Sequence, residues 1–333
     1  MKYFTLLLLL YTYTLCAQNK RENFSIDPSE QTVPGSLYNS IEFKDLRRDT
    51  TYLGVVQVGL MNAKARVVAK NPLQEQFNVL MASLAGSDAK QGKLLLTFRR
   101  FTFMERTTAT KETGFFFVRA DLYESNNDEY RWISTLDTIV QFNAMDVTQK
   151  LLRKGENLIT SFLKENLTKT PSSPRAYSLH ETSRIDSIQK SDLAVYTTTQ
   201  FTPGLYPTYE SFRDQKPTIT DFRTEEKKNS LKAVFIPVNE TGGLKKIDPD
   251  DYYAVVHNNT TYVATKAGYY PLEKIGEDFY YTGIIKSFRA GTAMMFGLLT
   301  AVIIGPKKDP TQFRMDHING SFLYNGRVKD DDD

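Results

Sequence analysis

The sequence predicts an α+β protein in which an N-terminal antiparallel sheet carries two packed helices and is followed by a mostly β C-terminal domain. Apolar residues recur at steps of three and four over 71–86 and again over 146–163, which is the spacing of one helix face. Three longer apolar runs lie between them, over 93–142. Beyond residue 193 the apolar runs are short and separated by turn residues, as in β-rich domains.

Both predicted helices begin with a residue that can cap the free backbone N–H groups. Asn71 precedes Pro72 at the first helical position, with Gln74 placed to reach back to the cap. Asp146 has the same relation to Gln149 in the second helix. The stripe of the second helix continues across a glycine, which costs about 1 kcal/mol relative to alanine. We expect both stripes to face a sheet.

The three central runs, 93–105, 115–122 and 130–142, predict an antiparallel meander with one face under a helix. Polar turn residues separate the runs. At the level of fold this order resembles the small α+β domains of bacterial envelope assembly and transport-auxiliary lipoproteins. No motif accompanies this likeness, so it implies a fold and not an activity.

The second half opens with a turn and a short helix in which Tyr209 and Phe212 are expected to pack inward. Its Gly204-x-Tyr206-x-Thr208-Tyr209-Glu210-x-Phe212 stretch resembles uncharacterised secreted proteins of the Bacteroidota over residues 193–325. That resemblance implies a β-rich region and no catalytic residue. The expected strands lie at 232–238, 252–257, 261–265, 269–275, 279–286 and 312–324, in a curled sheet or small open barrel.

The first seventeen residues have the pattern of a secretory signal peptide. Lys2 is followed by an uncharged, largely apolar run that ends at Cys16, and cleavage is expected after Ala17. A lipoprotein would also have a cysteine here, but Thr14 and Leu15 are a poor match to the small residues that precede a lipidated cysteine. We therefore expect export to the periplasm or an outer-membrane-associated location, and less so release outside the cell.

The composition excludes some kinds of partner and some kinds of covalent or metal cross-link. The chain of 333 residues is 41% hydrophobic and 24% charged, with a formal net charge of +3 spread along its length, so no nucleic-acid partner is expected. Cys16 is its single cysteine, so the part after residue 17 can form neither a disulfide nor a cysteine metal site. That pattern favours a bacterial envelope protein over a eukaryotic secreted one.

These patterns divide the chain into six predicted segments. They are a signal peptide (1–17), an extended lead-in (18–50), an α+β domain (51–168), a linker (169–192), a β-rich domain (193–326) that contains the apolar segment 290–305, and an acidic tail (327–333).

The apolar segment 290–305 has no charge and is flanked by Arg289, Lys307 and Lys308. Within it small residues recur every fourth position, which on a helix forms one line for close packing or membrane contact: Ala293, Gly297, Ala301 and Gly305. As a helix it would rise about 24 Å, short of a hydrocarbon core of about 30 Å. A buried core element, a membrane-contacting or self-associating helix and a plain strand all remain open.

The sequence contains no recognisable catalytic, cofactor-binding or metal-binding motif, so no catalytic residue, cofactor or metal is predicted. The weak candidates for a scattered hydrolase site are His257 near Asp250 and Asp251, and the pair Asp316-His317.

We therefore expect a non-enzymatic exported protein that binds or assembles with an envelope protein or a membrane surface, with possible self-association. The alternatives are a component anchored in the membrane through 290–305 and a secreted hydrolase with an unrecognised site.

Overall fold

The computed structural model describes residues 20–59, 62–108, 111–144, 146–228, 230–238, 242–285 and 307–327. It confirms a mixed α+β protein with curled sheets. The chain separates into two compact units, the first ending at Ser183 and the second beginning at Arg184.

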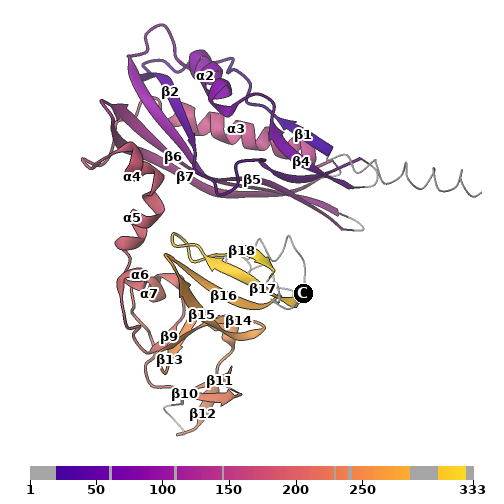
Figure 1. Cartoon of the computed structure of the whole chain (residues 1–333), viewed down its shortest axis with the longest axis vertical. Coiled ribbons are helices and arrows are strands. Elements are labelled where there is room, and N and C mark those ends of the chain that lie inside the picture. Colours follow the sequence, from indigo (N-terminus) through magenta and orange to yellow (C-terminus); the bar gives the residue numbers. More distant parts are fainter. Residues whose placement is uncertain are drawn as a thin grey trace, which may run out of the picture. The chain divides into compact units, whose positions relative to one another are not determined.

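The sheet of the first unit has the strand order β1-β4-β3-β5-β6-β7-β8, and β2 also pairs with β5. Helices α2 and α3 lie on one face of this sheet (Figure 1). The elements are β1 (Lys20–Phe24), β2 (Tyr38–Asp45), β3 (Gly54–Val58), β4 (Ala63–Ala69), α2 (Leu73–Leu84), β5 (Gly92–Thr108), β6 (Lys111–Asn126), β7 (Glu129–Ala144), α3 (Thr148–Asn166), β8 (Ala176–Tyr177) and α4 (Leu179–Ser183).

The predicted meander is confirmed, because β5, β6 and β7 pair antiparallel along their length. The prediction of a wholly antiparallel N-terminal sheet is wrong, because β1 pairs parallel with β4, and β2 and β3 each pair parallel with β5. Both β1 and β2 lie within 18–50, where the sequence predicted an extended lead-in. Their side chains Phe24, Tyr38 and Ile41 are buried, so this stretch contributes to the sheet and its core.

Strand β5 is seventeen residues long and shares one edge between two partners. Its first half pairs with β2, and Phe103 and Met104 in its second half pair with β3. Gly54 begins β3 at φ +139°, and a Cβ there would lie 1.9 Å from the Phe103 carbonyl oxygen. Only glycine allows so close an approach at that backbone angle.

Phenylalanine rings from β1, β5 and β6 pack against one another within the core between the sheet and the helices. The rings of Phe98 and Phe101 stack with their centroids 4.5 Å apart. The rings of Phe103 and Phe116 stack at the same centroid distance. Phe24, which lies on β1, packs edge-on against Phe101 with the ring centroids 5.4 Å apart. The stripes of α2 and α3 cover these rings, as their spacing predicts.

Neither helix is capped as the sequence predicts. Pro72 and Val147 occupy the cap positions, and neither makes a side-chain cap hydrogen bond. Gln74 instead accepts a hydrogen bond from the Phe43 N–H at 2.7 Å and donates to the Ile41 carbonyl at 3.1 Å. It thereby ties α2 to β2, and this tertiary contact replaces the local capping box.

The second unit has a seven-stranded antiparallel sheet of order β18-β17-β16-β15-β14-β13-β9 and a three-stranded sheet of order β10-β11-β12. Its helices are α5 (Ile185–Ser191), α6 (Ala194–Thr197) and α7 (Tyr209–Arg213). Its strands are β9 (Gly204–Tyr206), β10 (Arg223–Lys227), β11 (Ser230–Pro237), β12 (Leu244–Lys246), β13 (Ala254–His257), β14 (Thr260–Thr265), β15 (Gly268–Ile275), β16 (Asp278–Ile285), β17 (Lys307–Met315) and β18 (Phe322–Arg327).

The turn and short helix predicted over 204–212 fold as expected. Thr208 caps α7, and its side chain accepts a hydrogen bond from the Ser211 N–H in a reciprocal capping box. Tyr209 and Phe212 are buried among the rings of Tyr206 and Tyr253. The single strand predicted over 312–324 is instead parts of two strands, β17 and β18, separated by a turn in which the Gly320 N–H donates to the Asp316 carbonyl.

Gly155 lies where α3 crosses the phenylalanine core, and a Cβ there would come within 2.6 Å of the Phe103 ring. In an exposed helix, replacing glycine with alanine increases helix propensity. At position 155 the added methyl group would meet the Phe103 ring, which is fully buried and cannot move aside. We predict that Gly155→Ala lowers the free energy of unfolding by about 1–3 kcal/mol.

Urea titration followed by the fluorescence of Trp132, the single tryptophan, measures this change. Ser161→Ala on the exposed side of α3 is the control and should change stability by less than about 0.5 kcal/mol. A Gly155→Ala variant as stable as the parent would contradict this account of the helix–sheet contact.

Candidate functional site

The small-residue line Ala293, Gly297, Ala301 and Gly305 falls in 286–306, outside the described residues, so its role stays a prediction. Within the ranges that the structure describes, no helix is both long and apolar enough to cross a membrane.

The candidate residues near His257 each have a different partner. The His257 Nε2 atom lies 2.9 Å from the Thr224 Oγ1 and 3.7 Å from a carboxylate oxygen of Glu226, both on β10. Asp250 lies 3.8 Å from the Lys266 ammonium. His257 thus joins the three-stranded sheet to β13, whereas Asp250 faces the turn between β14 and β15.

The pair Asp316-His317 lies in the turn after β17 and is buried, with 4% and 5% of these residues exposed. The Asp316 carboxylate accepts a hydrogen bond from the Ile318 N–H at 3.0 Å. The His317 Nε2 atom lies 3.1 Å from the Gln189 side-chain oxygen on α5, and the Tyr209 hydroxyl donates to the His317 carbonyl. The Asp316 side chain therefore bonds within the turn, and the His317 side chain links the turn to α5.

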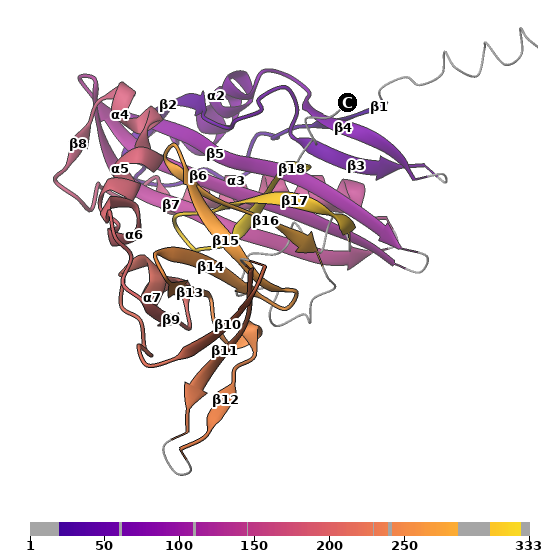
Figure 2. The same cartoon turned by 60° about the horizontal axis from the view of Figure 1, so that its bottom comes forward.

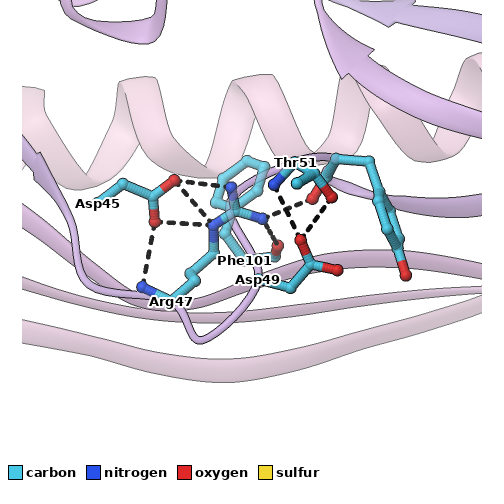
Figure 3. Close-up of polar contacts among 6 residues, drawn as sticks. Asp45, Arg47, Asp49, Thr51 and Phe101 are labelled. Carbon is cyan, nitrogen blue, oxygen red and sulfur yellow. Dashed lines mark hydrogen bonds and ion pairs between the residues drawn. The ribbon is translucent and has the colours of Figure 1, made fainter.

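Arg47 has an extensively hydrogen-bonded side chain (Figure 3). Its guanidinium donates to both oxygens of the Asp45 carboxylate, at 2.8 and 2.7 Å, and its Nη1 atom donates to the Tyr52 carbonyl at 2.8 Å. The same Nη1 atom lies 3.3 Å from the Phe101 carbonyl of β5. Only 7% of the Arg47 side chain is exposed.

The position of Arg47 explains its bonds. The Leu46 N–H bonds to the Phe98 carbonyl at the end of β2, and the Phe103 N–H bonds to the Leu53 carbonyl at the start of β3. Between these two points the edge of β5 has no backbone partner from either strand, and Arg47 supplies a donor to the carbonyl left there. A cavity of about 340 Å³ opens beside it, lined by Phe43, Asp45, Thr51, Tyr52 and Leu73 among others.

The Arg47 donors are engaged by Asp45 and by backbone carbonyls, so the site is a structural clamp with its charge neutralised by Asp45. The sequence shows only closely spaced charges from Asp45 to Asp49, which are typical of a surface loop. Nothing local in the sequence marks the missing strand partner that Arg47 replaces.

A second group of buried charges spans β5, β6 and β7. Arg99 pairs with Asp121 at 3.2 Å, and Arg119 pairs with Asp137 at 2.8 Å. The Thr135 hydroxyl donates to Asp121, whose side chain is 2% exposed. Because Arg119 and Asp121 alternate with the core residues of β6, these pairs lie on the sheet face opposite α3. They link neighbouring strands and favour one register.

In the second unit, Asp278 joins the predicted linker region to the sheet. Its carboxylate lies 2.7 Å from the Lys190 ammonium of α5 and 3.3 Å from the Arg314 guanidinium of β17. Burial alone would raise the pKa of Asp278, but the hydrogen bond from Lys190 and the charge of Arg314 outweigh burial and lower this pKa below the ordinary value of 3.8.

The three-stranded sheet presents an exposed outer face. Arg223, Phe235 and Lys246 lie directly opposite one another in the strand register and so share that face. Pro237 and Leu244 form the last pair before the turn, and Leu244 is 48% exposed. The other face is buried against the seven-stranded sheet through Val234, Ile236 and Ile247. Figure 2 shows the β11–β12 hairpin extending beyond the other strands of its unit.

The part of the chain that is described contains no group of three or more histidine, cysteine, aspartate or glutamate side chains placed to hold a metal ion.

Comparison with known proteins assigns no family to the chain. No protein-family model matches it, and no curated protein matches it. A crystal structure of a Xanthomonas campestris protein described as belonging to family DUF330 aligns over 44% of this chain and 95% of its own length, with 10% identity and a TM-score of 0.29. An uncharacterised protein aligns over 45% of this chain and 97% of its own length, with 11% identity and a TM-score of 0.23. Scores this low carry neither a fold nor a function to this chain.

We predict that Arg47→Leu lowers the free energy of unfolding by about 3 kcal/mol, because it leaves the half-buried Asp45 carboxylate and two backbone carbonyls without their donor. Arg131→Leu removes an ion pair whose partners are 45% and 58% exposed, so it should cost less than about 1 kcal/mol. Urea denaturation of both variants gives the comparison. Equal effects in the two would refute the clamp.

We predict that Asp278 makes the second unit less stable in acid. Since its pKa is lowered in the folded protein, its contribution is present above the ordinary carboxyl pKa and is lost as the pH falls through the folded value. Asp278→Asn should therefore be destabilised at neutral pH, and its difference from the parent should shrink as the pH falls below the ordinary carboxyl pKa and through the lower pKa of the folded protein.

Thermal unfolding followed by the near-ultraviolet circular dichroism of the tyrosines measures this difference. Glu129→Gln, which alters an exposed pair in the first unit, is the control and should show little difference at any pH. A difference between Asp278→Asn and the parent that stays constant with pH would contradict the assignment.

Proposed function

We propose that this chain is an exported bacterial envelope protein that acts by binding or assembly and catalyses no reaction, with an α+β domain followed by a β-rich domain. The observation that carries the proposal is the set of hydrogen bonds that the candidate catalytic side chains make. His257 and His317 each bind a side chain of a neighbouring element, and Asp316 bonds the backbone of its own turn. Each of these side chains thus has a hydrogen-bond partner within the fold.

Two features of the sequence support the location. The signal-like first seventeen residues favour export, and the lack of cysteine after residue 17 favours a bacterial envelope. The stretch Gly204–Phe212, similar to secreted proteins of the Bacteroidota, agrees with both. We therefore propose the periplasm or the outer-membrane surface as its place of action.

Export is tested by fractionating cells that produce the chain with a C-terminal tag. We predict that the tagged protein lies in the envelope fraction and begins at Gln18, as read by mass spectrometry of its N-terminal peptide. Leu8→Arg should retain it in the cytosol because a charge interrupts the apolar run, whereas Leu8→Ile should not.

A cytosolic protein that retains residues 1–17 would contradict the proposed location. An activity that disappears in His257→Ala or His317→Ala, while the variant keeps its circular dichroism, would contradict the absence of catalysis.

A further inference from the structure

Strand β7 has a long outer edge that pairs with no other strand among the described residues. On its inner side β7 pairs with β6 along its length. On its outer side the pairs formed within the described ranges are those of Tyr130 and Arg131 with the two-residue strand β8. From Trp132 to Ala144, every second residue directs its backbone N–H and C=O groups to this outer side, as in any antiparallel strand. An edge of this kind is a template for a further strand.

The β7 edge lacks the features that keep sheet edges from pairing. Residues 132–144 contain neither proline nor lysine and are rich in β-branched and aromatic residues, which favour strands. Asp137 is their single charged residue, and its carboxylate already pairs with Arg119 at 2.8 Å. At the opposite edge of the same sheet, β1 is five residues long and carries Lys20, Arg21 and Glu22. The β7 edge, unlike β1, is therefore suited to strand addition.

The side chains along the β7 edge are partly uncovered on both faces of the sheet. On the face that carries the helices, Leu136, Val140 and Phe142 pack against the core and are half-buried. On the other face Ile139 is 38% exposed. A partner that fits this edge offers backbone hydrogen bonds together with apolar side chains on each face.

A second copy of this chain supplies both. When two β7 strands pair antiparallel about a two-fold axis, directly opposed residues lie on the same face of the joined sheet. With Ile139 on the axis, the two Ile139 side chains meet, and Leu136 of each copy lies opposite Phe142 of the other. Asp137 then lies opposite Gln141, so like charges do not face one another. We propose that this protein forms a dimer by antiparallel pairing of its two β7 edges, centred on Ile139.

The geometry favours a second copy over an extended peptide. A peptide bound to β7 would present a new free edge of its own, whereas two β7 strands satisfy each other and close the assembly. A second copy also brings its own α3 to the face on which Leu136, Val140 and Phe142 lie. The apolar layer between sheet and helices would then continue from one copy into the other.

This inference rests on the proposed function, because it names the partner of a protein that acts by binding or assembly. The two can fail separately. Self-association is measured on the purified chain without residues 1–17 and does not depend on export, whereas fractionation does not depend on the β7 edge.

The first experiment is sedimentation equilibrium of that chain over a series of concentrations. The parent should be a dimer. Ile139→Lys should raise the dimer dissociation constant about tenfold or more, because it replaces an apolar cross-strand pair with two like charges directly opposite each other. An equimolar mixture of Ile139→Lys and Ile139→Glu should dimerise as the parent does, because opposite charges then face each other.

The matched control is Val79→Lys, which places the same charge at a side chain 52% exposed on α2. It should dimerise as the parent does. A parent that stays monomeric throughout the series, or an Ile139→Lys variant that dimerises as tightly as the parent, would overturn the proposal. So would a monomeric parent that binds a synthetic peptide of residues 134–144, since the edge would then take a peptide.

The second experiment tests the register by cross-linking. Because the chain after residue 17 has no cysteine, Ile139→Cys introduces one thiol, and a two-fold axis at this residue brings two such thiols together. Directly opposed residues of antiparallel strands have Cα atoms about 4.5–5.5 Å apart, within the range of about 4.4–6.8 Å that a disulfide spans. Oxidation with diamide should therefore convert this variant to a covalent dimer on a non-reducing gel.

Gln141→Cys is the control for the cross-link, because Gln141 is exposed on the same face of the same strand. In the proposed register the two copies of residue 141 are offset by four residues, which is about 14 Å along the strand. Their thiols should stay unlinked. Equal cross-linking of the two variants, or none at position 139, would overturn the proposed pairing.

Discussion

The first unit depends on the contact between the phenylalanine rings of β5 and β6 and the two helices that cover them. Stacked and edge-to-face pairs of this kind contribute about 0.5–1.5 kcal/mol each beyond the burial of their area. Phe98, Phe101, Phe103 and Phe116 form a continuous set of such pairs, and Phe24 extends it to β1. A chain without cysteine after residue 17 cannot supplement this packing with disulfides. The helix α3 can reach the rings because position 155 has no side chain.

The same core explains why the long strand β5 has two partners on one edge. Its Phe98 lies opposite β2, and its Phe103 lies opposite β3, so both halves of the strand carry rings into the core. The chain between the two partners must leave the sheet and return, which exposes the Phe101 carbonyl at the break. Arg47 donates a hydrogen bond to this carbonyl, which places a positive charge in the interior. The Asp45 carboxylate neutralises that charge. A polar cluster that resembles a binding site is thus a consequence of the sheet topology.

The sequence predicts well what depends on local periodicity. The helix stripes, the β5–β7 meander and the inward Tyr209 and Phe212 follow from spacing, and the structure confirms them. Pairing between distant segments is not periodic, so the parallel partners of β1 and β2 are missed. The predicted caps fail where tertiary contacts compete, as when Gln74 bonds to β2. The outer face of β10–β12 is missed because its cations come from separate strands, and only the register brings Arg223 and Lys246 to one row.

Amide hydrogen exchange of the chain without residues 1–17, resolved by peptide, tests the central place of the phenylalanine core most directly. Exchange through local opening reports how strongly each segment is held. The account predicts the slowest exchange in the peptides that contain Phe101–Phe103 and Phe115–Phe117, and exchange at least an order of magnitude faster at Leu244–Lys246 on the exposed hairpin. Core peptides that exchange as fast as the hairpin would contradict it.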